Sequence, residues 1–192
     1  ASATSVGTID SSGQVNTAVG FSIVSYTGTG SDGTVAHGLS SAPEVVLHKN
    51  RTDDTDWEFI TTAIDGSVDY LRFTTAAKGN SSRTAATSTV FEVGSGSNQG
   101  ASGKDYIAYC FHSVEGYSKF GVYQGRANAN GMFVFTGFRP AWLMIKNTGA
   151  TGSWIIFDNT REGGVSNIVN DHLMANTNAV EGTDSDIDIL SN

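Results

Sequence analysis

The chain contains one short sequence pattern twice, and this repeat constrains its fold more than any other feature. The segments "PEVVLHKN" (43–50) and "PAWLMIKN" (140–147) each begin with proline, continue through mostly apolar residues and end in Lys-Asn. Six polar residues follow each segment, and then a tryptophan, Trp57 or Trp154. The two cassettes are offset by 97 residues (140 − 43). A repeat at a fixed offset indicates two copies of one structural unit.

Neighbouring segments extend the repeat. "GFSIVSYTG" (20–28) matches "GYSKFGVYQG" (116–125) with one inserted residue, and "GTVAHG" (33–38) matches "GMFVFTG" (131–137) with a small gap. "DIDILSN" (186–192) falls where "TVFEVGS" (89–95) falls in the first copy. No segment of the second copy corresponds to "DYIAYCF" (105–111). We therefore expect the second copy to lack at least one strand, which either further residues of the polypeptide or another chain would supply.

The local patterns predict β-strands. Short runs of β-branched and aromatic residues alternate with turn residues, and the 23 glycines suit turns better than helices, where each costs about 1 kcal/mol relative to alanine. In the first copy we predict strands at 20–28, 43–50, 57–60, 70–75, 88–94 and 105–113. The prediction is an all-β protein of two tandem homologous β-sandwich (jelly-roll-like) units, 20–115 and 116–192, the second lacking its last strand or strands. Residues 1–19 are small and polar, and are predicted to be a flexible arm or linker.

The repeated positions have a structural interpretation. Proline suits the start of a strand because it cannot donate to a ladder inside one, and Lys-Asn is polar and turn-forming. The tryptophans are expected to pack in the core of each unit rather than to form a sugar platform. The repeat positions are Pro43, Lys49, Asn50 and Trp57, with Pro140, Lys146, Asn147 and Trp154.

Composition limits the partners. The formal net charge is −8 and only 16% of residues are charged, so the surface must be largely Ser, Thr, Asn and Gly. Nucleic-acid binders need a basic face, so this class of partner is not expected. No apolar run approaches the roughly 18 residues of a membrane helix, so membrane insertion is not expected either.

The sequence gives no catalytic constellation, and we do not expect an enzyme. Cys110 and His112 share a strand face, but no residue clearly orients the histidine, so a buried inert thiol is the favoured interpretation. The glycine-rich segment 93–100 precedes a strand, which favours a hairpin loop over a phosphate loop. No cofactor is expected, with Ca²⁺ as the one exception. Three alternating carboxylates could bind Ca²⁺, or they could instead lie on a solvent-exposed face of a sheet. These carboxylates are Asp184, Asp186 and Asp188.

A resemblance to known proteins points to a biological setting. The string "YIAYCFHSVEGYSKFGVYQG", followed by "GMFVFTGFRPAWLMIKN" and a tryptophan, resembles a repeated module in virion proteins of tailed, mainly marine, bacteriophages. The likeness covers roughly residues 20–192. It implies a tail-fibre-like or other surface-exposed protein and gives no catalytic residues. Members of this family usually continue past "IDILSN" with further strands, which agrees with the expectation of a missing strand.

The expected function is therefore a structural virion protein (a tail fibre, capsid fibre or decoration protein) on the particle surface. We expect self-association or assembly with other virion subunits, with a trimer favoured, and adhesion to a host-surface glycan is a further expectation. Two alternatives stay open: a carbohydrate-binding module of a secreted protein, and an extracellular filament subunit assembled by strand exchange. Exposed aromatic residues would bind a glycan, and the candidates are Tyr26, Tyr117, Tyr123 and Trp142.

Overall fold

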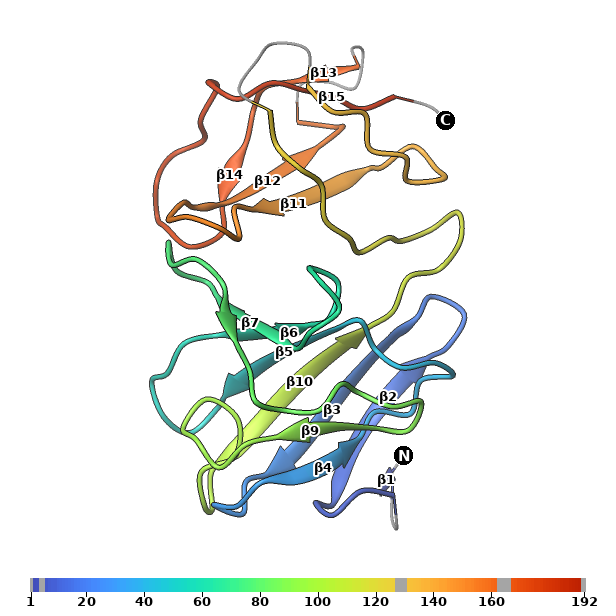
Figure 1. Ribbon diagram of the computed structural model, residues 1–192, viewed down its shortest axis with the longest axis vertical. Helices are drawn as coiled ribbons and strands as arrows, with labels where there is room; N and C mark the ends of the chain where they lie inside the picture. Colours follow the sequence, from blue (N-terminus) through green and yellow to red (C-terminus); the bar gives the residue numbers. More distant parts are fainter. Residues whose placement is uncertain (1, 4–5, 127–130, 162–166, 191–192) are drawn as a thin grey trace. The chain divides into compact units, whose positions relative to one another are not determined.

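A computed structural model of the chain describes residues 2–3, 6–126, 131–161 and 167–190 (Figure 1). Every regular element in these ranges is a β-strand, which confirms the all-β prediction. Among the described residues, no helix is long and apolar enough to cross a membrane. The strands are β1 (Ser2–Ala3), β2 (Ser11–Asn16), β3 (Phe21–Thr27), β4 (Gly33–Ala36), β5 (Val45–Asn50), β6 (Glu58–Thr61), β7 (Asp69–Arg72), β8 (Gly79–Asn80), β9 (Val90–Val93), β10 (Asp105–Phe111), β11 (Trp142–Lys146), β12 (Trp154–Asp158), β13 (Ile168–Val169), β14 (Leu173–Met174) and β15 (Ile187–Asp188).

The chain forms two compact units. Unit 1 consists of Ala1–Arg72 and Gly79–Val122, and unit 2 consists of Phe73–Lys78 and Tyr123–Asn192. A short segment between β7 and β8 thus belongs to the second unit, where the Phe73 ring packs edge-on against Trp154 with centroids 5.0 Å apart. The predicted boundary between the sequence repeats, after residue 115, stays a prediction.

Unit 1 contains two sheets. The larger has eight strands in the order β1-β2-β3-β10-β5-β6-β7-β8, and the smaller pairs β4 with β9. Strand β10 lies inside the large sheet. It pairs antiparallel with β3 on one side and with β5 on the other. The sequence explains this position, because "DYIAYCF" is apolar or aromatic at almost every residue and suits a strand with neighbours on both edges.

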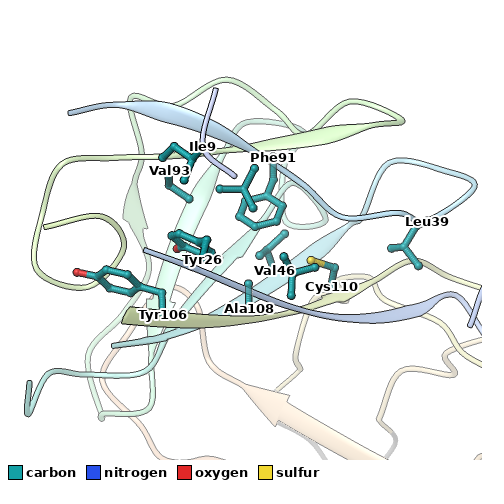
Figure 2. Packing of buried hydrophobic residues seen from close by; sticks show 11 residues of the cluster. Ile9, Tyr26, Leu39, Val46, Phe91, Val93, Tyr106, Ala108 and Cys110 are labelled. Atoms are coloured by element: carbon teal, nitrogen blue, oxygen red, sulfur yellow. The ribbon is translucent and has the colours of Figure 1, made fainter. Parts of the chain in front are cut away.

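The core of unit 1 lies between these two sheets (Figure 2). Tyr106, Ala108 and Cys110 of β10 are each 0% exposed and face the core. Because side chains alternate along a strand, Ile107 and Tyr109 lie on the opposite face of the sheet. The remaining members of the buried cluster come from both sheets and from two loops: Ile9, Val24, Tyr26, Val35, Leu39, Val46, Phe91 and Val93.

The prediction of a flexible arm at residues 1–19 is wrong for the described part of that segment. Residues 11–16 form β2, which pairs with β3 over six residues, from Ser11↔Tyr26 to Asn16↔Phe21. Ile9 just before it is 5% exposed and belongs to the core cluster. Local polarity was a poor guide because the neighbouring strand β3 supplies the hydrogen-bond partners that stabilise this strand.

Unit 2 has a smaller version of this arrangement. One sheet has the order β11-β12-β14, and a second pairs β13 with β15. Among the described residues, its main buried apolar cluster consists of Phe157, Val169 and Ile189. Four partly buried residues pack against them: Leu143, Ile145, Ile155 and Ile187.

The repeated cassette has the same strand register in both units. In unit 1, β5 and β6 pair with Val46 opposite Ile60. In unit 2, β11 and β12 pair with Leu143 opposite Phe157, and each of these residues lies 97 positions after its counterpart. The asparagine of the Lys-Asn pair accepts the same pair of turn hydrogen bonds in both units. The Asn50 side-chain oxygen accepts from the backbone N–H groups of residues 52 and 53 at 2.8 and 2.9 Å, and that of Asn147 accepts from residues 149 and 150, both at 3.0 Å.

Other parts of the second copy differ from the sequence prediction. Within the described residues, the segments matched to β3 (116–125) and to β4 (131–137) contain no strand longer than an isolated bridge between Val114 and Ser118. Within the segment matched to 89–95 (186–192), Ile187–Asp188 form a strand that pairs with β13, and residues 191–192 lie outside the described part of the chain. The sequence pattern of a strand is present in these segments, but a strand also needs a neighbour to hydrogen-bond with.

Candidate functional site

The most unusual surface of the molecule is a run of exposed apolar side chains in unit 2. Met132, Phe133, Val134 and Phe135 are 43%, 65%, 47% and 62% exposed, and Trp142 at the start of β11 is 55% exposed. We call the four consecutive residues, Met132, Phe133, Val134 and Phe135, the apolar patch. Single exposed apolar residues are ordinary on protein surfaces, but four consecutive large ones are typical of an interaction surface.

Comparison with unit 1 shows what the patch corresponds to. The counterparts of Phe133 and Val134 are Val35 and Ala36 of β4, which are 0% and 4% exposed. In unit 1 these residues pair with β9 and close over the large sheet. The same positions of the repeat are therefore core in one unit and surface in the other. The sequence analysis matched residues 131–137 to residues 33–38 and did not predict their exposure.

The four aromatic residues predicted to bind a glycan differ in how exposed their side chains are. Tyr117, in unit 1, is 60% exposed, and Tyr123 and Trp142, in unit 2, are 47% and 55% exposed. Tyr26 is only 4% exposed, so its assignment as a surface platform is wrong. Its ring stacks on Tyr106 with centroids 5.3 Å apart, because β3 and β10 place the two residues directly opposite each other.

Tyr26 instead belongs to a buried hydrogen-bond network. Its hydroxyl donates to the Gln99 carbonyl at 2.7 Å and lies 3.2 Å from Nδ1 of His48. Burial raises the pKa of Tyr26 well above its ordinary value and lowers the pKa of His48 to about 3, the positive charge of Arg83 adding to the effect on the histidine. Both side chains are thus neutral at physiological pH, as a buried pair without a counter-ion requires.

The glycine-rich segment 93–100 belongs to this network. It was predicted as a hairpin loop, but it connects β9 of the small sheet to β10 of the large sheet. The Tyr106 hydroxyl donates to the Ser97 carbonyl at 2.9 Å, and the Gln99 side chain donates to the carboxylate of Glu58. Arg72 also donates to Glu58, at 3.2 Å. The polar groups here satisfy one another, which favours a structural role for the loop.

The cysteine has the properties of a core residue. Cys110 is 0% exposed, and burial raises the pKa of its thiol to about 12. The thiolate is the nucleophilic form of cysteine, so this side chain is not poised for attack. The favoured interpretation of a buried inert thiol agrees with this geometry.

The three aspartates considered for Ca²⁺ lie at the end of unit 2. Asp184, Asp186 and Asp188 are all exposed, and an Asp184 oxygen lies 3.5 Å from Nε2 of the buried His172. Within the described ranges, no three His, Cys, Asp or Glu side chains are grouped so that they could hold a metal ion. A calcium site here stays a prediction.

The two repeat tryptophans have different surroundings. Trp154 is 3% exposed and packs in unit 2, as expected of a core residue. Trp57 is partly buried and packs on the outer face of the large sheet, where its ring lies 6.1 Å from that of Tyr109 and 6.0 Å from the Lys49 ammonium. The expectation that Trp57 packs in the core of unit 1 is therefore wrong, because its side chain lies on the face of the sheet opposite the core cluster. The prolines that open the cassettes, Pro43 and Pro140, are both buried.

Comparison with known proteins assigns a family. The family model described as "Domain of unknown function (DUF7483)" matches residues 1–192, so the chain belongs to this family. Searches of curated proteins and of solved structures found no match to it.

Proposed function

We propose that this member of the DUF7483 family is a structural module of an assembled particle, and specifically a surface-exposed virion protein of a tailed bacteriophage. The observation that carries the proposal is the apolar patch, which places consecutive large apolar side chains on the surface of a chain with a net charge of −8. Such a surface is stable in solution when a neighbouring subunit covers it. The resemblance to phage virion modules supports the choice of particle.

Other features favour a structural role in an assembled particle over a catalytic role. The buried polar side chains around residues 93–100 bind one another and the backbone of the loop, and the thiol is sealed in the core. The low content of charged residues, 16%, suits a chain covered by hydroxyl and amide groups and packed among copies of itself. A tandem pair of β-units is also the usual construction of fibres built from repeated modules.

Two measurements test the proposal. Mass spectrometry of purified particles from the virus that encodes the chain should detect it, and immunogold electron microscopy should place it on the particle surface. Light scattering coupled to size-exclusion chromatography should give a discrete homo-oligomer, with a trimer expected. In that assay Phe135→Ser should weaken the oligomer, whereas Val180→Ser, which changes an apolar residue that is 90% exposed but outside the patch, should leave it intact. Absence of the chain from purified particles would contradict the proposal.

A second function, glycan adhesion, is favoured by the exposure of Tyr123 and Trp142. Aromatic rings with an exposed face can stack on sugar rings. A glycan array should then show binding by the wild-type protein and at least tenfold weaker binding by Trp142→Ala. Tyr26→Phe would be the matched control, since this buried ring cannot reach a ligand. No binding to any glycan would leave the purely structural role.

A further inference from the structure

Unit 1 contains a small cavity that is lined by β5, β6 and β9 and by the segment before β9. Its volume is about 20 Å³, which is room for one group of the size of a water molecule. Part of the lining is apolar and comes from Val46, Ile60 and Phe91. Thr84, which is exposed, also lines the cavity, so the cavity reaches the surface and a ligand can place one small group inside it.

The guanidinium of Arg83 brings an unused hydrogen-bond donor to this cavity. Its Nε atom is buried and has no partner within the described part of the chain, whereas Nη1 donates to the Ser81 hydroxyl at 3.1 Å. The guanidinium lies against Gly94, where a Cβ would be 2.1 Å from Nη2 and 3.1 Å from Nε. A buried donor without a partner costs free energy, so Nε–H favours a ligand that accepts a hydrogen bond.

His48 brings the complementary group, an unused acceptor. The Tyr26 hydroxyl donates its one proton to the Gln99 carbonyl at 2.7 Å, so it accepts from Nδ1–H of His48 at 3.2 Å. This tautomer leaves Nε2 without a proton, and no group of the described residues donates to it. The side chain is 1% exposed and lines the cavity. Its pKa of about 3 keeps Nε2 available as an acceptor at physiological pH.

The charges around the cavity decide which chemistry fits these two groups. An anion only accepts hydrogen bonds, and it would also meet the carboxylates of Glu44 and Glu92, which line the same cavity. An ammonium group only donates, and it would meet the positive charge of Arg83. A hydroxyl group is uncharged and can accept from Arg83 while it donates to His48.

We propose that this cavity binds the hydroxymethyl group of a polyol or a sugar. The hydroxyl oxygen accepts from Nε–H of Arg83, and the hydroxyl proton is donated to Nε2 of His48. A hydroxyl on a one-carbon arm can enter a cavity of this size, whereas a hydroxyl on a sugar ring would bring its ring carbons with it. The inference goes beyond the proposed function, because the cavity lies in unit 1 and its lining includes neither the apolar patch nor Trp142.

Nuclear magnetic resonance titrations of the 192-residue protein test the proposal with two pairs of probes. Glycerol represents the polyols, and glycerol trimethyl ether is its control because ether oxygens accept hydrogen bonds but cannot donate. Methyl glucoside represents the sugars, and the matching 6-deoxy glucoside is its control because a methyl group replaces the hydroxymethyl group.

We expect saturable shifts of the Nε–H signal of Arg83 and of the Nε2 nitrogen signal of His48 with at least one hydroxymethyl probe. The control of that probe should bind at least tenfold more weakly. The probe that binds identifies the source of the hydroxymethyl group.

Substitutions localise the binding. Arg83→Met removes the donor and should lower the affinity for the probe at least tenfold, whereas Arg51→Met removes the same charge at an exposed residue outside the cavity and should not. Gly94→Ala keeps the charge but displaces the guanidinium, so it should also weaken binding at least tenfold. Gly96→Ala is its matched control, since a Cβ there has nothing within 4 Å. Thermal unfolding midpoints show which variants are folded, and Gly94→Ala tests the donor even if Arg83→Met does not fold.

Four outcomes would overturn the proposal: no saturable shift with either hydroxymethyl probe, equal binding of a probe and its control, shifts of the same two signals by sodium acetate or methylammonium chloride, or a His48 ring that carries its proton on Nε2. Wild-type affinity of both Arg83→Met and Gly94→Ala would also contradict it. Trp142→Ala should leave the binding unchanged, so this inference and the proposed adhesion at Trp142 can fail separately. None of these results depends on whether the chain is found in virus particles.

Discussion

At the scale of single residues, polar side chains inside unit 1 decide how its stability depends on pH. His48 is 1% exposed, and burial, with the charge of Arg83 as a second cause, lowers its pKa to about 3. The pKa of His37 is also lowered, first by burial. The unfolded chain binds protons at both sites near pH 6.5, whereas the folded chain binds them at lower pH.

We therefore predict that acid destabilises unit 1 between pH 6.5 and pH 3. In this range the unfolded state binds more protons than the folded state, so the free energy of unfolding falls as the pH falls. The part due to His48 is about 3 kcal/mol between pH 7 and pH 4. Urea unfolding at a series of pH values should show a smaller dependence for His48→Gln than for wild type. Parallel curves for the two proteins would contradict the assignment.

At the scale of elements, the asparagine that follows each cassette strand offers a matched pair of substitutions. The side chains of Asn50 and Asn147 accept the same two kinds of turn N–H, but Asn50 is 1% exposed and also donates to the Ser97 carbonyl at 2.9 Å. Asn147 is exposed. Removing a buried polar partner leaves other groups without hydrogen bonds, which costs more than the same change at the surface.

We predict that Asn50→Ala lowers the free energy of unfolding by about 2–3 kcal/mol and Asn147→Ala by about 0.5–1 kcal/mol. Urea denaturation followed by circular dichroism would measure both. Asn50→Asp tests the cause, since its oxygen can still accept from the turn while it no longer donates to Ser97. Equal losses for the two alanine variants would contradict the role given to burial.

The same elements show which parts of the fold the sequence could predict. β3, β5, β6, β7, β9 and β10 were predicted because β-branched and aromatic residues stand between glycines or polar loops. β2 was missed because Ser11–Asn16 has a strand's hydrogen bonds without a strand's composition. At residues 131–137 the composition of a strand is present, but the structure has no strand there. The sequence pattern shows which conformation the side chains favour. Whether a strand forms also depends on the neighbouring strand that it can pair with.

The candidate site was harder to predict for the same reason. Exposed aromatics were expected, and Tyr117, Tyr123 and Trp142 are exposed, but Tyr26 has the same composition context and lies in the core. Tyr26 is buried because β4 and β9 pack over the large sheet. The sequence around Tyr26 does not indicate this tertiary packing.

At the scale of the whole molecule, the two units differ in how much apolar surface they bury. Among the residues that the structure describes, eleven buried residues form the cluster of unit 1 and three form that of unit 2. Local opening costs less where fewer apolar contacts are lost. We expect unit 2 to open more readily than unit 1 in the isolated chain.

Hydrogen exchange measured by mass spectrometry would check this expectation. Amides in β3, β5 and β10 should exchange most slowly, and those in β11, β12 and β14 at least tenfold faster. The residues 58–61 of β6 serve as an internal control for β12, because they occupy the same place in the repeated hairpin. Equal protection of β6 and β12 would show that the smaller cluster suffices to hold its unit closed.

The identical register of the two β-hairpins has a consequence for how such chains can change length. Unequal recombination between the gene segments that encode residues 43–61 and 140–158 would insert or delete 97 codons. At the point of exchange each new hairpin would combine a first strand from one copy with a second strand from the other, and every cross-strand partner would stay in place. Insertion or deletion at this hairpin therefore leaves its own strand pairing intact, whichever copy supplies each strand.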